Sequence, residues 1–328
     1  MTAISAEKSV DLSKRLSARG FSTLYRKELA DHFHSARFKV IFCLLILTSA
    51  ASLYGALSEI SNVTTSSSEY IFLSLYTTSG SSIPSFASFL AYLAPVAGLA
   101  LGFDAINRER SQGTLNRLVS QPIHRDAVIN AKFLAGATVI LMMIMFLGIM
   151  VGGIGLVCIG IPPTGEELAR IFVYLLLTSV YTALWLALSM LFSVVSKHAA
   201  TSALITIAIW IFFTLFATMV VQIIANLIYP LDGIAGYYNM YDNYSLQLTL
   251  DRFSPYYLYC EAASTLLNPN VRTLGITTQA SYSGAVASYL SFDQSVLLIW
   301  PHLTCMLALT IAAFTISYIA FMRQEIRA

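Results

Sequence analysis

The sequence predicts an all-α, polytopic membrane protein with six transmembrane helices and both termini in the cytosol. Its composition is the first reason: of 328 residues, 57% are apolar and only 11% are charged, whereas soluble domains carry about a quarter charged residues. Six helix-length apolar runs are the second reason. A strong bias of basic residues toward one side of these runs is the third. The net charge of +2 gives no reason to expect a nucleic-acid partner.

The six runs are long enough to cross a bilayer, whose core of ~30 Å needs about 20 apolar residues in a helix. They cover residues 38–57, 83–103, 133–161, 171–195, 202–228 and 296–322. Pro84 and Pro95 predict that the second helix is kinked or starts late. Gly98 with Gly102, and Gly148 with Gly152, have the four-residue spacing that lets helix backbones approach closely, inside one chain or between subunits.

Lysine and arginine residues set the orientation. With residues 1–37 in the cytosol, 16 of the 19 basic residues lie on the cytosolic side, and Arg170, Arg252 and Arg272 lie outside. This excess satisfies the positive-inside rule. An even number of spans then returns the C-terminus to the cytosol.

The segments outside the spans differ in character. Residues 1–37 contain a basic amphipathic stretch with apolar residues at helical spacing: Phe21, Leu24, Tyr25, Leu29 and Phe33. We expect it to lie along the inner membrane surface. The loop 104–132 contains a polar, helix-forming stretch at 108–120 that ends before Pro122. The outer segment 230–295 is acidic and rich in tyrosine, and we expect it to be partly helical near Tyr256. Glycosylation sequons at Asn62 and Asn243 also fall outside, and their use depends on the host.

Catalytic motifs are missing. The chain has no phosphate-binding loop and no paired-histidine zinc motif, so we expect no enzyme activity, cofactor or metal on it. Residues 166–170 come within one residue of the spacing used by intramembrane prenyl-protein proteases, but acidic residues at a helix N-terminus are the simpler interpretation. Gln222 and Asn226 form the clearest polar pair within a span. They indicate either hydrogen bonding between helices or a substrate path.

The cytosolic loop carries a recognisable pattern. Glu109-Arg110, Gly113-Thr114-Leu115, Pro122, Arg125 and Lys132 resemble the intracellular loop of ABC-2 type permeases, the membrane subunits of ATP-binding-cassette exporters. The Tyr-Arg-Lys-Glu-Leu entry from Tyr25, the six spans, the long outer segment and the Met-Arg-Gln-Glu ending from Met322 are similar to that family too. The resemblance covers essentially the whole chain and is nearest to permeases of the Nos type.

The resemblance implies a transport function in the plasma or inner membrane. A separately encoded ATPase would bind ATP and magnesium, and two permeases, identical or different, would assemble with two ATPases. The loop would form a coupling helix that docks on the ATPase, with Glu109 and Arg110 as polar anchors. Gly113 would allow close approach, Thr114 would supply a hydrogen bond, and Leu115 and Leu118 would be the apolar anchors. Two alternatives stay open: a non-transporting scaffold that passes ATPase motion to an extracytoplasmic protein through 230–295, and an intramembrane enzyme.

Overall fold

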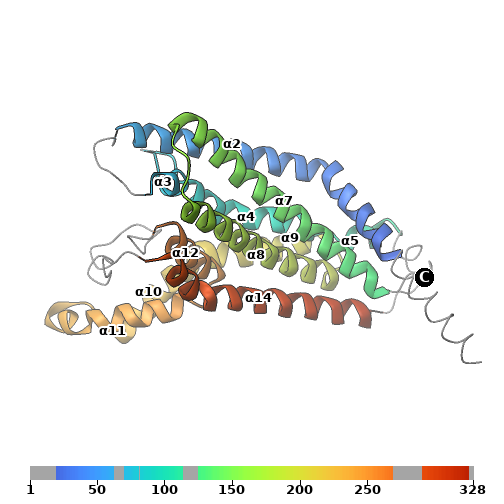
Figure 1. Cartoon of the computed structure of the whole chain (residues 1–328). Coiled ribbons are helices and arrows are strands. Elements are labelled where there is room, and N and C mark those ends of the chain that lie inside the picture. Colours follow the sequence, from blue (N-terminus) through green and yellow to red (C-terminus); the bar gives the residue numbers. More distant parts are fainter. Residues whose placement is uncertain (1–19, 63–69, 81, 114–124, 269–289, 325–328) are drawn as a thin grey trace, which may run out of the picture.

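The computed structural model describes residues 20–62, 70–80, 82–113, 125–268 and 290–324. The regular structure in these ranges is helical (Figure 1). Residues 20–34 are helical and lead into the first long helix. The labelled elements are α2 (Ala36–Asn62), α3 (Ile71–Thr77), α4 (Phe86–Gly102), α5 (Asn107–Ser111), α7 (Arg125–Ile159), α8 (Gly165–Val195), α9 (Ala199–Ile211), η1 (Phe212–Phe216), α10 (Ala217–Ile228), α11 (Gly233–Asp251), α12 (Pro255–Leu267) and α14 (Phe292–Arg323).

Six helical stretches in the described part of the chain are long and apolar enough to cross a membrane, which confirms the predicted all-α fold with six spans. They cover Ala36–Ile60, Phe86–Ser111, Arg125–Ile159, Gly165–Val195, Ala199–Ile228 and Phe292–Arg323. We call the end of the bundle with residues 20–34 and α5 the inner end, and the opposite end the outer end. These terms follow the predicted orientation.

The second span starts late, as its prolines predict. Pro84 lies before the helix, and α4 begins at Phe86. The side chain of Ser85 caps it by accepting a hydrogen bond from the Ser88 amide at 3.2 Å. Such a cap satisfies one of the amides that have no partner in the first turn. Pro95 is accommodated inside the helix.

The fourth span, α8, is the centre of the bundle, and 67% of its most apolar stretch is buried. It packs against α4, α7, α12 and α14. A Cβ added to Gly98 of α4 would lie 2.5 Å from the backbone oxygen of Thr182 in α8. A Cβ at Gly102 would lie 2.7 Å from Ser189 Oγ. The predicted close approach is therefore within the chain for this glycine pair.

The glycine pair of the third span also packs within the chain. Gly148 faces the side chain of Leu175 in α8, and a Cβ at Gly152 would lie 2.8 Å from the hydroxyl of Tyr76 in α3. That hydroxyl donates to the Gly148 carbonyl at 2.9 Å. The small residues of α7 thus make room for both α8 and the short helix α3.

Arg170 of α8 connects three helices at the outer end. Its side chain is 0% exposed, so its charge needs partners within the chain. It pairs with Glu166 at 2.8 Å. It also donates to the backbone oxygens of Leu266 in α12, at 3.0 Å, and of Leu290 just before α14, at 2.6 Å. A further partner is the hydroxyl of Ser295 in α14, at 3.0 Å. Glu167 forms a capping box with Thr164 at the start of α8. The acidic residues of 166–170 therefore begin a helix, as predicted.

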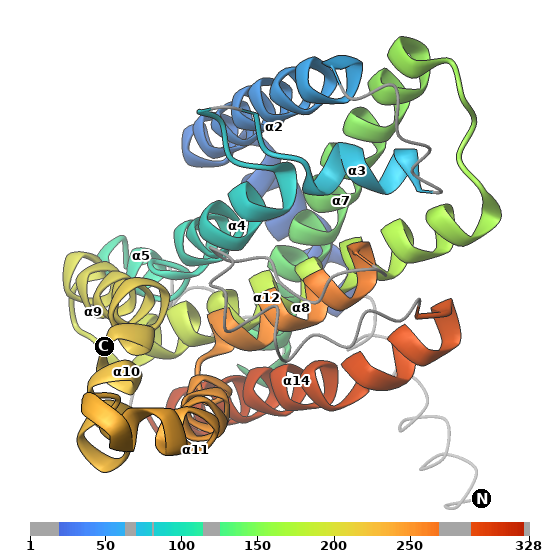
Figure 2. The same ribbon diagram turned by 90° about the vertical axis from the view of Figure 1, so that its left-hand side faces the viewer.

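The fifth span differs from the others because its helix is interrupted. A π-helical turn, η1, lies between α9 and α10, and only 17% of the most apolar stretch is buried. Beyond it, α11 turns back along α10, and this α10–α11 hairpin extends past the other helices at the outer end (Figure 1). Seen from that end, α9, α10 and α11 form one edge of the molecule (Figure 2).

The outer segment is partly helical, as predicted. Helix α12 contains the expected amphipathic stretch, and its Leu258, Ala262 and Leu266 are buried against the bundle. The 19-residue helix α11 has no counterpart in the sequence-based description. Residues 269–289 lie outside the described ranges.

Candidate functional site

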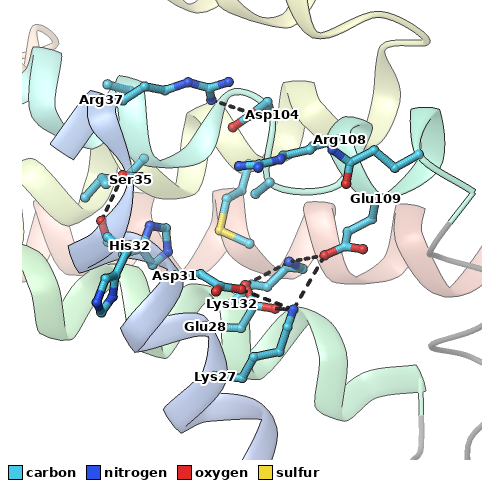
Figure 3. A pocket seen from close by; sticks show the side chains of 16 residues that line it. Lys27, Glu28, Asp31, His32, Ser35, Arg37, Asp104, Arg108, Glu109 and Lys132 are labelled. Atoms are coloured by element: carbon cyan, nitrogen blue, oxygen red, sulfur yellow. Dashed lines mark hydrogen bonds and ion pairs between the residues drawn. The ribbon is translucent and has the colours of Figure 1, made fainter.

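Three segments that are distant in sequence meet at a buried charge cluster at the inner end. Lys132 of α7, whose side chain is only 6% exposed, lies between Glu28 of the helix 20–34 and Glu109 of α5. Its Nζ donates to Glu28 Oε2 at 2.9 Å and to Glu109 Oε1 at 3.3 Å (Figure 3). A buried lysine needs such partners, because an isolated charge out of water is costly. We call Glu28, Glu109 and Lys132 the inner triad.

Lys27 covers the inner triad from the solvent side. Its Nζ lies 3.2 Å from Glu28 and 3.3 Å from Asp31, and 4.0 Å from Glu109. Partial burial opposes the charge of Lys27, but the neighbouring carboxylates outweigh burial and raise its pKa. Its side chain is 49% exposed, so this outer pair contributes little to stability compared with the buried one.

A second ion pair joins the first two spans at the same level. Arg37 of α2 pairs with Asp104, which follows α4. Its guanidinium also lies over the ring of Phe103, 4.9 Å from the ring centre. The start of the first span and the end of the second are thereby held together beside the inner triad.

Arg110 anchors the other side of α5. It donates to the backbone oxygen of Ser196 at 3.3 Å and to the side chain of Gln324 at 2.5 Å. Gln324 in turn donates to the Val194 carbonyl at 2.7 Å. The turn before α5 is held by Ser193, whose hydroxyl accepts from the Ile106 amide at 3.1 Å. The short helix α5 is therefore attached both to α7 and to the inner ends of α8 and α14.

A cavity of about 560 Å³ lies between these segments. Figure 3 shows the inner triad, Lys27, Asp31, His32 and the Arg37–Asp104 pair around it. Burial lowers the pKa of His32, so this histidine is mainly neutral at pH 7. The inner triad, Lys27 with Asp31, and Arg37 with Asp104 thus line the cavity as charges that already form pairs.

The predicted coupling residues divide into two groups. Glu109 and Arg110 are described, and both bind other parts of the same chain. Helix α5 ends at Ser111, and Gly113 follows it with a φ of +67°, so the predicted continuous helix over 108–120 is wrong. A Cβ at Gly113 would meet no atom within 4 Å. Glycine adopts positive φ without the steric cost that other residues meet. Thr114, Leu115 and Leu118 lie outside the described residues, and docking of this loop on an ATPase stays a prediction.

Two anchoring residues were not recognised as important from the sequence, Glu28 and Gln324. Each lay inside a motif that supported the family resemblance, at the entry to the first span and after the last span. Only their contacts with Lys132 and Arg110, 104 and 214 positions away, reveal their roles.

The predicted polar pair of the fifth span lies on the α10–α11 hairpin. Gln222 and Asn226 are both exposed. Asn226 Oδ1 accepts from Asn243 Nδ2 of α11 at 2.9 Å, so half of the pair serves packing within the chain. Asn243 is 2% exposed and hydrogen-bonded, which leaves no room for a glycan in this conformation. A substrate path along Gln222 and Asn226 stays a prediction.

The described residues contain no group of three or more His, Cys, Asp or Glu side chains placed to hold a metal ion. The inner triad can carry force between helices, and its two carboxylates are already paired with Lys132 and with Lys27. Its ion pairs connect three segments of the chain.

Comparison with known protein families gives one match that covers most of the chain. Residues 22–326 match the family described as "ABC-2 family transporter protein". No curated protein matches the chain.

Proposed function

Because the chain belongs to the ABC-2 family of transporter proteins, we propose that it is the permease subunit of an ATP-driven exporter. A separately encoded ATPase binds ATP and magnesium and hydrolyses ATP, while this chain forms the path across the plasma or inner membrane. The six apolar helices support a multi-pass membrane subunit. The chain itself takes no part in the chemistry of hydrolysis.

The observation that carries this proposal is the attachment of α5 on two sides. A force applied to the loop that follows Gly113 acts on α5. It passes through Glu109 to Lys132 of α7 and to Glu28 ahead of the first span. It passes through Arg110 to the inner ends of α8 and α14. Helices that move as rigid bodies need such fixed contacts to transmit a displacement.

The working unit in this proposal contains two permeases and two ATPases, with identical or different permeases. The fifth span supports a second protomer, since it is the least buried of the six spans in this chain. Exposed side chains on it include Leu215, Met219, Ile223 and Leu227. Lipid covers such a surface adequately in the membrane. Helix α11, however, lies beyond the span and exposes Tyr237, Tyr238 and Tyr241, which a second protomer would cover.

The experiment separates docking from transmission. Leu115→Asp with Leu118→Asp should abolish co-purification with the ATPase, because a charge replaces each proposed apolar anchor. Lys132→Met should leave co-purification intact and uncouple ATP hydrolysis from export, because the inner triad is lost and the loop is not. Lys197→Gln removes an exposed charge from the inner end and should change neither.

Two results would contradict the proposal. Full co-purification and export by the double Leu115/Leu118 variant would remove the loop from the ATPase interface. Normal coupled export by Lys132→Met, with the protein folded, would remove the inner triad from the path of transmission.

A second candidate function is a scaffold that moves nothing across the membrane and passes ATPase motion to a protein outside. The observation that favours it is the row of exposed aromatic side chains on α11: Tyr237 is 84% exposed, Tyr238 78% and Tyr241 79%. Such residues are enriched at protein interfaces. Substrate-stimulated ATPase activity in liposomes that contain only permease and ATPase supports the exporter. Stimulation that requires an added outer protein supports the scaffold.

A further inference from the structure

A second cavity of about 340 Å³ lies toward the outer end, where α12 and α14 meet the last residues of the α11 helix. We call it the outer pocket. Its lining combines three ionisable side chains with an apolar wall: Arg252, Glu261 and His302, with Leu258, Thr265, Leu298 and Pro301. Neither the family nor the proposed coupling mechanism gives this cluster a role.

The ionisable residues form a connected group around Glu261. Arg252 donates to the Glu261 carboxylate from Nη2 at 2.7 Å and from Nε at 3.1 Å, and His302 Nε2 lies 2.8 Å from the same carboxylate. Burial opposes ionisation of Glu261, but the hydrogen bonds from His302 and Arg252 outweigh it and lower its pKa to about 2. The charges of Arg252 and Glu261 offset each other, so any further anion depends on the donors that this pair leaves unused.

Arg252 keeps capacity for a further ligand. Its side chain is 52% exposed, and its third guanidinium nitrogen, Nη1, makes no hydrogen bond to a described residue. Arginine is well suited to phosphate, because its planar donors match the phosphate oxygens and it stays charged. The remaining donor favours an anion.

The surroundings of the outer pocket are those of a lipid-facing surface. On α14, Leu297 is 75% exposed and Trp300 is 60% exposed, and Phe253 beside Arg252 is 76% exposed. Tryptophan side chains such as Trp300 gather at the boundary between lipid and water. The pocket lies ~10–15 Å along α14 from its first residue, at 1.5 Å per residue. Its apolar wall therefore continues into a surface that acyl chains contact.

We propose that the outer pocket binds the phosphate of an anionic phospholipid from the outer leaflet. Arg252 holds the phosphate through Nη1, while His302 keeps Glu261 in place at 2.8 Å. Leu298 and Pro301 guide one acyl chain along α14. The volume is at the lower end of the range for ligand pockets, so it holds a headgroup and leaves the chains outside. A soluble phosphate would make no use of the apolar wall, which is why a lipid is the better ligand.

The test measures lipid retention by native mass spectrometry of the purified chain, titrated with phosphatidylglycerol and, separately, with phosphatidylcholine. The unaltered protein should retain phosphatidylglycerol more strongly. Arg252→Gln should weaken this binding about tenfold or more, since a charged hydrogen bond is lost. Arg252→Lys should recover part of it. The matched control is Lys197→Gln, which removes one exposed positive charge at the opposite end.

Three outcomes overturn the proposal: equal retention of the two lipids, no loss in Arg252→Gln, or an equal loss in Lys197→Gln. Displacement of the lipid by millimolar inorganic phosphate would assign the site to a soluble anion and also overturn it. If Arg252→Gln unfolds, Arg252→Lys serves as the second variant, because it keeps the charge but loses the planar donors of the guanidinium. Lipid binding by a folded Arg252→Lys that equals the binding of the unaltered protein contradicts the role of the guanidinium. Co-purification with an ATPase is a separate readout, so this result and the proposed function can fail independently.

Discussion

At the scale of single residues, Lys132 shows how a charge becomes structural. Its ammonium group is nearly removed from solvent, and two carboxylates from other segments replace the lost water. A buried ion pair of this kind adds little net stability compared with an apolar contact, yet removal of Lys132 is severe because two buried carboxylates lose their nearest cation. The inner triad therefore fixes the relative position of three segments and makes that position sensitive to one side chain.

Lys132→Met should lower the free energy of unfolding by about 3–5 kcal/mol, since Glu28 and Glu109 are left without their shared cation. Thermal unfolding in detergent measures the change. Adding Glu28→Gln to this variant should recover part of the loss. The control Lys27→Met removes a half-exposed partner and should cost less than about 1 kcal/mol. Equal losses for both lysines would contradict the assignment.

Asp251 gives a prediction with a defined pH dependence. It is 6% exposed, and its Oδ1 has no hydrogen-bond partner among the described residues. Burial raises its pKa from 3.8 to about 6. Between pH 4 and pH 6, Asp251 therefore keeps its proton in the folded state but has lost it in the unfolded state. The folded protein loses stability as the pH rises through this range, because the buried carboxyl group must finally ionise.

Asp251→Asn should remove this cost. Its stabilising effect should be small at pH 4, grow up to about pH 6 and then stay constant at ~3 kcal/mol or less. Melting temperatures of both proteins across this pH range test it. A stabilisation that is the same at pH 4 and pH 8 would show that ionisation of Asp251 is not the cause.

The sequence identifies residues better than it identifies their contacts. Glu109 and Lys132 are recognisable from their motif. The motif does not show that Lys132 Nζ donates to Glu109 Oε1 at 3.3 Å. Arg170 looks like part of an outer loop, whereas it is buried because the carbonyls of Leu266 and Leu290 reach it from distant segments. Such partners depend on how the helices pack against one another, and the spacing of residues in one sequence does not show which helices pack together.

At the scale of helices, the contact between α4 and α8 depends on glycine. Gly98→Leu should separate the two helices, since even the first added carbon would lie 2.5 Å from the Thr182 oxygen, which is backbone and cannot rotate away. We expect a loss of several kcal/mol or failure to fold, measured by thermal unfolding. The control is Gly153→Ala in α7, where the new carbon meets nothing within 4 Å and helix propensity improves.

The positions of helices were predictable where a long run of apolar residues forms a span, and less predictable outside the spans. All six spans were placed by composition, because lipid selects long apolar runs. The α11 helix was missed since its Gly- and Tyr-rich sequence has a weak helical pattern, and its packing along α10 holds it in place. The π-turn η1 was missed too, because a change from i+4 to i+5 hydrogen bonding leaves no spacing signal among uniformly apolar residues.

At the scale of the whole molecule, orientation in the membrane is open to direct measurement. A single cysteine introduced at Asn268 should react with an impermeant thiol reagent from outside intact cells, and one at Ser111 should react only after the cells are opened. The reason is the predicted excess of basic residues on the side of α5. The native cysteines, Cys43, Cys158, Cys260 and Cys305, are first replaced by serine. Labelling at Ser111 in sealed cells would reverse the orientation.

The arrangement of two protomers gives a second prediction at this scale. We expect the first, second and fifth spans to face the partner permease, and cysteines at Gln222 or Asn226 to crosslink between protomers. Cysteines at Ile149 and Val157 of α7, which are 70% and 83% exposed, are the matched controls for an exposed helix face. Crosslinks that form efficiently from these α7 positions and not from the fifth span would place the interface elsewhere.

The fifth span, with its π-turn near the middle and its hairpin beyond the other helices, has the geometry of a lever with a short inner arm. Helix α11 alone is 19 residues long, or ~28 Å at 1.5 Å per residue. A tilt of ~10° about η1 would move its far tip by about 5 Å, while the backbone beside η1 would hardly shift. The same tilt would move the inner end of the 13-residue helix α9 by about 3 Å, so a displacement at that end would reach the tyrosine-bearing tip enlarged about 1.4-fold.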